Sequence, residues 1–252
     1  ERYGELRRIE NRYHGEINHY FLCDRGRFGH GYVNRKDRPR QPWHVLGEGK
    51  KIMTVDESLD AAATALKACK RVIGIGSPRA SIEANFALRQ CVGEANFYTG
   101  INAAELTLIQ LAHTILQNSP ARTPSLREME SADAVFVVGE DVTQTAPRVA
   151  LALRQAVKNK SLQMAADSKI AHWHAAGIRD IAQTEKSPLF IGSFIETRLD
   201  DVAELTYRAP ANNIARLCIA HGFCIVYRRP ARTGLTAAEE TQALHIAQAL
   251  ML

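Results

Sequence analysis

The sequence predicts an α/β protein in which a small N-terminal segment of strands and loops precedes a Rossmann-like, open, mostly parallel sheet flanked by helices. Short apolar runs at 71–75, 134–139 and 189–192 alternate with longer stretches of helical periodicity. Strands separated by helices favour right-handed crossovers in an open sheet. The composition also changes near residue 45, from Gly, Arg and Tyr to helical patterns. We therefore expect one domain over 1–45 and a second over 46–252.

Local signals predict the individual elements. Thr54 and Glu57 have the spacing of a capping box and begin a helix. Gly93 ends a helix over 81–91, because glycine readily takes the left-handed conformation of a helix terminus. Residues 134–139 have the uninterrupted apolar pattern of a strand buried on both faces of a parallel sheet. The remaining helices are expected over 104–116, 147–157, 162–181 and 237–252, with a short helical turn that has Pro124 at its first position.

Composition excludes several classes of protein. No run of about 18 apolar residues is present, which argues against a membrane-spanning helix. Five cysteines at irregular spacing do not form a secreted disulfide framework and indicate a reducing compartment such as the cytoplasm. Because Glu1 is not an initiator methionine and the final helix has no C-terminal signal, we expect the chain to be an internal segment of a longer protein, truncated at its C-terminus.

The net charge of +5 is located entirely in residues 1–51, where 12 Lys and Arg accompany 7 Asp and Glu. Basic residues interleaved with tyrosines and phenylalanines are one pattern of nucleic-acid binding. A solvated or interface-facing basic surface is a second interpretation. The third is that Arg25 and Arg27 lie beside an anionic cofactor, and the spacing around Cys23 favours it.

Cys23 is the most informative single residue, because it lies in the Gly- and Arg-rich segment Phe-Leu-Cys-Asp-Arg-Gly-Arg-Phe-Gly at 21–29. Such a cysteine can be inert, a reactive thiol or a thiolate ligand, and an iron–sulfur cluster normally needs four thiolates. The other cysteines are too scattered to complete a ligand set: Cys69, Cys91, Cys218 and Cys224. Either Cys23 has no metal role, or its partners lie outside this chain.

Two loops follow predicted strands, where open parallel sheets bind ligands. Residues 74–79 resemble a dinucleotide-binding loop, but Arg79 replaces the third glycine of GxGxxG. We interpret these glycines as the requirement of a tight strand-to-helix turn. Residues 139–143 contain two carboxylates, Glu140 and Asp141, which would repel a phosphate.

A second group of soft ligands occurs at helical spacing near the C-terminus. Cys218, His221 and Cys224 lie at i, i+3 and i+6, so a zinc site is conceivable, although a fourth ligand is lacking. Cysteine is also one of the most frequently buried residue types, which favours core packing. His172 and His174 are two residues apart on a predicted helix and so point in different directions, which predicts surface histidines.

The segment around Cys23 resembles the region that closes the [4Fe–4S] domain of the molybdopterin oxidoreductase superfamily. The similarity includes Cys-Asp-Arg-Gly-Arg-Phe at 23–28, Gly-Tyr-Val-Asn at 31–34 and Asp-Arg-Pro at 37–39. Residues 72–85 and 133–147 resemble the first two Rossmann-like strand–loop–helix units of that family, and Arg-Leu-Asp-Asp-Val-Ala at 198–203 resembles a later one.

Within the superfamily the blocks are most similar to the iron–sulfur scaffold family of bacterial NADH:quinone oxidoreductase, the respiratory complex I. This resemblance extends over about residues 1–210 and fades from about Cys224 to Arg232. The superfamily's catalytic members place a Cys, SeCys or Ser metal ligand in the stretch corresponding to 96–105, where this sequence has none. The resemblance therefore implies a non-catalytic scaffold and electron-transfer subunit without molybdopterin. A catalytic formate dehydrogenase-like enzyme is the alternative, and a nucleic-acid-binding module is a distant one.

The resemblance also implies a site. Cys23 would be the fourth ligand of a [4Fe–4S] cluster in the intact subunit, whose three other cysteines lie upstream in the family, and residues 1–45 would be the remnant of that cluster domain. Arg25 would be a basic neighbour of the cluster. In this chain alone we expect no cluster and no catalytic residue. The implied partners are other subunits of the enzyme's peripheral arm, on the cytoplasmic side of the inner membrane, without nucleic acid or a direct membrane span.

Overall fold

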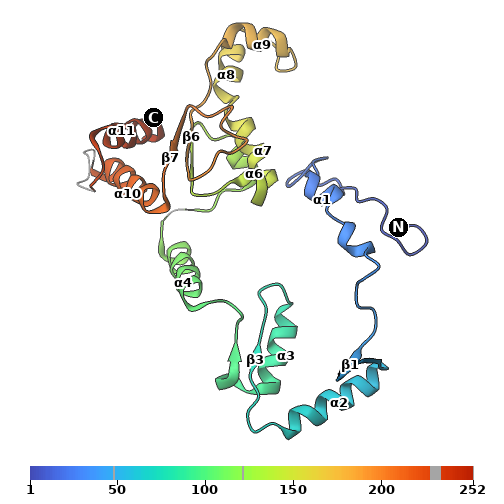
Figure 1. The fold of residues 1–252 in the computed structure, drawn as a ribbon. Helices are drawn as coiled ribbons and strands as arrows, with labels where there is room; N and C mark the ends of the chain where they lie inside the picture. Colours follow the sequence, from blue (N-terminus) through green and yellow to red (C-terminus); the bar gives the residue numbers. More distant parts are fainter. Residues whose placement is uncertain (48, 121, 228–233, 252) are drawn as a thin grey trace. The chain divides into compact units, whose positions relative to one another are not determined.

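The computed structural model describes residues 1–252 except 48, 121, 228–233 and 252, and the side chains of 46, 221 and 223–227 are likewise outside the description. The chain forms two compact units (Figure 1). The first combines Glu1–Val33 with Thr123–Leu252, and the second is Asn34–Arg122. The two units are defined by packing within this chain. The boundary predicted at residue 45 instead separates the two types of domain that the family resemblance implies. That boundary stays a prediction.

A three-stranded parallel sheet forms the centre of the first unit. Its strands are β5 (Val135–Val138), β6 (Leu189–Ser193) and β7 (Leu205–Arg208), in the order β5-β6-β7. Both strand pairs are parallel. Helices lie on both faces of this sheet in Figure 1. The prediction of an open, mostly parallel sheet flanked by helices is therefore confirmed.

The alternation of side chains along β6 builds two hydrophobic cores. Leu189 and Ile191 point to one face and pack in a cluster with residues of α7 (Pro147–Ala156). Phe190 points to the other face, where it packs against α10 (Ala211–Tyr227) and α11 (Ala237–Met251). Successive residues of a strand face opposite sides of the sheet, so one apolar strand can supply both cores. β6 is buried over its whole length.

β5 differs from the strand predicted at 134–139. Of its residues only Val137 is buried, and Val138 is exposed. Both faces of β5 pack as predicted, with Val135 and Val137 in one core and Phe136 against the other, but β5 is less completely buried than β6, which takes the central position. An apolar run indicates a strand, but the run alone does not give the strand's position in the sheet.

The helix predicted over 162–181 is in fact two helices, α8 (Asn159–Asp167) and α9 (Ala175–Ala182). Lys169 takes the left-handed conformation with φ of +58°. Its amide donates to Ala166 O, and the next amide donates to Ala165 O. These two bonds form a Schellman-type helix end, in which lysine stands where glycine is the usual signal. The break places His172 and His174 in an exposed connection rather than on a helix.

The short turn predicted at Pro124 begins later than expected. Helix α5 (Leu126–Glu130) is capped by Ser125, which forms a capping box with Glu128. Pro124 therefore precedes the cap and is not the first helical residue. The final helix α11 agrees with the expected 237–252, except that residue 252 is outside the described residues.

Arginine side-chain contacts attach the N-terminal segment to the sheet layer of the first unit. The segment contains α1 (Asp24–Phe28) and is followed by a 3-10 turn at Gly31–Asn34. Arg148 on α7 donates from Nε to Ile17 O at 2.6 Å and pairs through Nη2 with Glu130 at 2.6 Å. Only 14% of the Arg148 side chain is exposed. This arginine therefore connects three segments that are distant in the sequence.

The second unit consists of a hairpin and a small α/β element. Strands β1 (Trp43–Leu46) and β2 (Gly49–Ile52) pair antiparallel, whereas β3 (Gly74–Ile75) and β4 (Phe97–Tyr98) pair parallel. Its helices confirm the predicted ones. They are α2 (Val55–Ala68), with the Thr54–Glu57 capping box, α3 (Ile82–Val92), which ends at Gly93 with φ of +82°, and α4 (Ala103–Asn118).

Candidate functional site

Cys23 lies at the N-cap of α1. Its Sγ atom accepts a hydrogen bond from the Gly26 amide at 3.3 Å, and its side chain is half-buried. The turn that follows requires glycine, because a Cβ on Gly29 would lie 2.4 Å from Arg25 O. The loop therefore holds the sulfur in one place by local backbone geometry.

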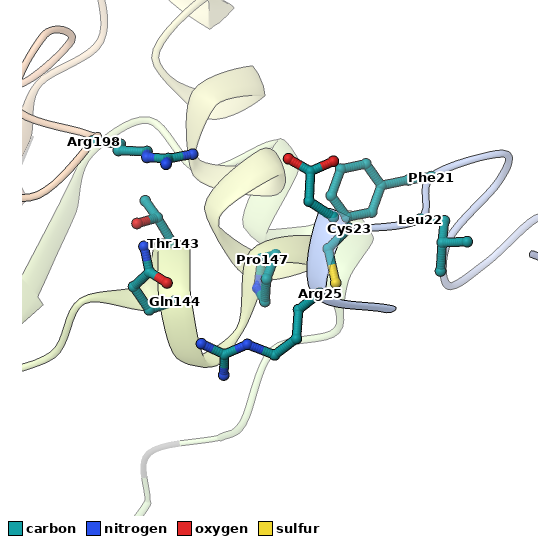
Figure 2. A pocket seen from close by; sticks show the side chains of 9 residues that line it. Phe21, Leu22, Cys23, Arg25, Thr143, Gln144, Pro147 and Arg198 are labelled. Atoms are coloured by element: carbon teal, nitrogen blue, oxygen red, sulfur yellow. The ribbon is translucent and has the colours of Figure 1, made fainter. Parts of the chain in front are cut away.

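A cavity of about 290 Å³ opens beside this sulfur. Figure 2 shows Cys23 and Arg25 on the N-terminal segment opposite Thr143, Gln144 and Arg198. The complete lining is Phe21, Leu22, Cys23, Asp24, Arg25, Thr143, Gln144, Pro147 and Arg198. Residues that are more than a hundred positions apart in the sequence thus line one cavity beside Cys23.

Thr143 and Gln144 reach the cavity because α6 (Val142–Thr145) begins soon after β5. Asp141 caps this helix, and its Oδ1 accepts from the Thr143 amide at 3.0 Å and from the Thr143 hydroxyl at 2.6 Å. The Asp141 carboxylate is therefore occupied as a helix cap. The loop at the carboxyl end of β5 contributes neutral hydrogen-bonding side chains to the cavity, as the general position of ligand sites in open sheets suggests.

The turn after β6 positions Arg198. Asp200 accepts from the Thr197 hydroxyl at 2.8 Å and forms an ion pair with Arg208 on β7. Burial alone would raise the pKa of Asp200, but the hydrogen bonds from Arg208 and Thr197 hold that pKa below its usual value. A firmly ionised Asp200 keeps this turn against the end of the sheet, so the Arg198 side chain is presented from a fixed backbone.

The charges around the cavity favour an anionic occupant. Arg25 and Arg198 supply two guanidinium groups, whereas Asp24 is the one carboxylate in the described lining. A guanidinium is always protonated and stabilises a nearby anion most strongly where water is partly excluded. The sequence singled out Cys23 and Arg25 but missed Thr143, Gln144 and Arg198 as neighbours. The sequence did contain one signal for these three residues, because they lie in segments 133–147 and 198–203, which resemble the family.

The glycine loop at 74–79 is organised by Asn85 on α3. The Asn85 side-chain amide accepts from the Ser77 backbone amide at 3.0 Å and donates to Ser77 O at 2.9 Å. A Cβ on Gly76 would lie 2.4 Å from Asn85 Oδ1. Because Asn85 takes the Ser77 amide, that N–H is not available to a phosphate. This geometry supports the interpretation of the loop as a tight strand-to-helix turn.

The other described cysteines do not assemble with Cys23. Cys69 and Cys91 are exposed in the second unit, and burial raises the pKa of the half-buried Cys218 thiol. The side chains of His221 and Cys224 lie outside the described residues, so the possible zinc group stays untested. Among the side chains that the structure describes, no group of three or more His, Cys, Asp or Glu is placed to hold a metal ion.

The basic N-terminal segment carries several local ion pairs. Arg8 pairs with Glu10 and Arg35 pairs with Asp37. The hydrogen bond from Arg35 lowers the pKa of the Asp37 carboxyl. Part of the positive charge is thus already neutralised by neighbouring carboxylates.

Comparison with known proteins decides the family. The chain is 55% identical over 250 residues to the G subunit of NADH-quinone oxidoreductase from Escherichia coli K12, covering 99% of this chain and 28% of that protein. The corresponding protein of Yersinia pestis is 52% identical and that of Pseudomonas fluorescens 51%, each with 27% of its length covered. The chain belongs to the G-subunit family of NADH-quinone oxidoreductase. No protein-family profile matches it.

The similarity to the G-subunit family extends further than the sequence blocks suggested. It covers at least 99% of the chain and so continues past residue 210, whereas the fading over about Cys224 to Arg232 stays a prediction. The chain spans little more than a quarter of the length of these relatives. No helix among the described residues is both long and apolar enough to cross a bilayer.

Proposed function

We propose that this chain is part of a scaffold and electron-transfer subunit in which Cys23 provides the fourth thiolate of a [4Fe–4S] cluster. The three other thiolates would come from a part of the subunit that this chain does not include. When bound, such a cluster accepts and donates single electrons. The observation that carries the proposal is the position of Cys23 beside a cavity lined by two arginines, in a chain more than half identical to a G subunit of NADH-quinone oxidoreductase.

The residues around Cys23 fit one corner of such a cluster. Hydrogen bonds from backbone amides to ligand sulfurs are one of the features that set the potential of iron–sulfur clusters, and the Gly26 amide already donates to Sγ. Arg25 and Arg198 would offset the negative charge that four thiolates bring. Cys23 would hold the metal, Gly26 would fix the sulfur, and the two guanidinium groups would stabilise the charge.

The rest of the first unit would act as the scaffold that presents this corner. Its two-sided core holds the loops after β5 and β6 against the N-terminal segment. By the name of its relatives, the subunit would assemble with other subunits of an NADH-quinone oxidoreductase. We propose that it does so in the peripheral arm, at the cytoplasmic face of the inner membrane, and that electrons from NADH pass to quinone in the complete enzyme.

The cluster assignment is tested by replacing Cys23 with serine in the full-length subunit, prepared anaerobically. Iron and acid-labile sulfide should fall by the content of one [4Fe–4S] cluster, and one electron-paramagnetic signal should disappear. Cys69→Ser and Cys91→Ser are matched controls, because both thiols are exposed and lie in the other unit. Unchanged iron together with unchanged paramagnetic signals in the Cys23→Ser protein would show that this thiol is not a ligand.

The 252-residue chain alone gives a second test. One ligand of four cannot retain a cluster, so the isolated chain should show no cluster absorbance after anaerobic expression. A stable cluster in the isolated chain would contradict the proposed ligand set. Molybdenum or tungsten together with pterin in the full-length subunit would favour the catalytic alternative.

A further inference from the structure

The chain between α7 and β6 makes an excursion over residues 158–186 that contains α8 and α9. Its two ends meet at Ser187, whose amide donates to Val157 O at 2.9 Å and whose hydroxyl accepts from the Lys160 amide at 3.1 Å. The two helices pack against each other and extend beyond the sheet at the top of Figure 1. Residues 158–186 therefore form a closed helical hairpin, which we call the α8–α9 arm.

The fold of the first unit does not require this arm. Parallel strands need a crossover connection, usually one helix, and α7 already supplies that helix between β5 and β6. Among the described side chains, neither of the two hydrophobic cores includes a residue of the arm. An element that adds no layer to the core contributes a surface instead, and functional sites are commonly built on such additions to a fold.

The tip of the arm presents Trp173, of which 84% is exposed. The Trp173 carbonyl accepts from the Ala175 amide at 3.0 Å, which fixes its backbone in a turn. A Cβ on Gly177 would lie 2.8 Å from His174 Nδ1, so this glycine lets the neighbouring ring approach α9 closely. The rings of His174 and Trp173 are 5.8 Å apart. The tryptophan is thus presented from an ordered turn, which lowers the entropy cost of binding.

A tryptophan in this position is a typical anchor of a protein interface. Its large apolar surface has few rotatable bonds, and tryptophan is enriched among the residues that dominate binding energy. Lys169, His172 and His174 are near it in the sequence and are exposed as well. A lysine ammonium and an indole can only donate hydrogen bonds, so the tip favours a surface rich in acceptors. The complementary surface is an apolar pocket with carboxylates at its rim.

Two other occupants fit the tip less well. A second copy of the chain would place two sets of these cations against each other across a two-fold axis, where like charges repel. A nucleic acid would meet the exposed carboxylates of Asp167 and Asp180 on the same arm, which repel phosphates. The relatives also favour a protein partner, because each is named as the G subunit of an enzyme.

We infer that the tip of the α8–α9 arm is a docking element that inserts Trp173 into an acidic-rimmed apolar pocket of another subunit. Lys169 supplies the positive charge that orients the contact. The inference rests on the assembly with other subunits that forms part of the proposed function. It does not depend on Cys23 as a cluster ligand.

Oxidative labelling of Trp173 tests the inference on three samples: the 252-residue chain, the full-length subunit alone, and the assembled enzyme. Hydroxyl radicals modify an accessible indole, and peptide mass spectrometry measures the rate at this residue. The rate should be similar in the first two samples. In the assembled enzyme it should be at least about tenfold lower, because an interface anchor is shielded from water.

A variant of the full-length subunit measures what the anchor contributes. Trp173→Ala should weaken binding to the remaining subunits at least about 30-fold, the loss typical of an interface anchor. Gln163→Ala, at an exposed polar position of the same arm, is the matched control and should change the affinity less than about twofold. Because Trp173 is exposed, its replacement should leave the circular dichroism spectrum and the iron content unchanged. Equal affinities of Trp173→Ala and the original would overturn the inference.

Reversal of one charge tests the acidic rim. Lys169→Glu should weaken the binding about tenfold at low salt, and its difference from the original should shrink as the salt concentration rises. Lys158→Glu makes the same change at an exposed position at the base of the arm and should have a clearly smaller effect. An affinity of Lys169→Glu equal to the original would overturn the acidic rim.

Four results of the labelling experiment would also overturn the inference. Protection of Trp173 already in the full-length subunit would assign the tip to the same polypeptide. Protection in the 252-residue chain that grows with protein concentration would assign it to a second copy, and protection by an added oligonucleotide would assign it to nucleic acid. Equal reactivity in all three samples would show that the tip docks nowhere. A full-length subunit that binds no other subunit would overturn the proposed assembly as well.

Discussion

The two α/β elements of this chain share a local pattern but differ in burial. In the first unit, β6 is buried along its length and helices pack on both of its faces. In the second, β3 and β4 have α3 on one face and exposed Ile75 and Tyr98 on the other. The comparison teaches that a strand–helix pattern predicts a layer of an α/β fold, whereas stability requires the second layer as well.

The largest effect is expected from removing a large side chain at the centre of the first unit. Phe190 is completely buried, so Phe190→Ala should cost about 3–5 kcal/mol of unfolding free energy in the 252-residue chain. Phe86→Ala is the matched control, because Phe86 is 56% exposed, and it should cost less than about 1 kcal/mol. Urea denaturation measures both. Equal costs would mean that the second unit has a core of its own.

A smaller effect is expected from loosening the N-terminal segment that carries Cys23. Arg148→Met keeps the alkyl stem but removes the bonds to Ile17 O and Glu130, and should cost about 2 kcal/mol. Exchange in the amides at 14–20 should accelerate. Arg127→Met removes one exposed 3.2 Å bond to Gly15 O and should have a clearly smaller effect. The reverse order would show that Arg148 does not hold the segment.

The contact between Tyr207 and Glu239 tests how α11 is attached to β7. The Tyr207 hydroxyl donates to the Glu239 carboxylate. Tyr207→Phe removes this bond without changing the ring and should lower the free energy of unfolding by about 1 kcal/mol at neutral pH. Urea denaturation with tyrosine or circular dichroism detection measures the change. No change at all would show that the hydrogen bond does not hold α11 in solution.

The same tyrosine predicts a dependence on alkaline pH. Burial, then the hydrogen bond to Glu239 and the charge of that carboxylate, raises the pKa of Tyr207 to about 12. Because the unfolded tyrosine ionises near a pKa of about 10, its contribution to stability is complete below pH ~10 and is lost as the pH rises toward ~12. Tyr207→Phe should remove that part of the decline. An identical pH profile in the variant would contradict the assignment.

The smallest global effect is expected from the glycine loop of the second unit. Asn85→Ala frees the Ser77 amide and should accelerate its exchange, because two side-chain bonds to the loop are lost. The stability of the first unit should stay within about 0.5 kcal/mol of the original, since the loop belongs to the other unit. A large shift of the first unit's denaturation midpoint would mean that the two units unfold together.

Local signals in the sequence predicted many of the elements. The Thr54–Glu57 capping box and the terminal Gly93 located two helix ends correctly, because such signals act through the nearest backbone groups. The break at Lys169 was missed, since a lysine in the left-handed conformation has no strong sequence signal. The helix predicted over 162–181 failed for that reason.

The sequence by itself determined the α/β class and the family relationship, and it predicted Cys23 as the site residue, because these depend on local patterns and on residue identity. Only the tertiary structure decided that β6 and not β5 is the central strand, and that Thr143, Gln144 and Arg198 line the same cavity as Cys23. Only it revealed the bare face of β3–β4. Burial and the meeting of distant residues depend on which elements pack together, and no local pattern contains that information.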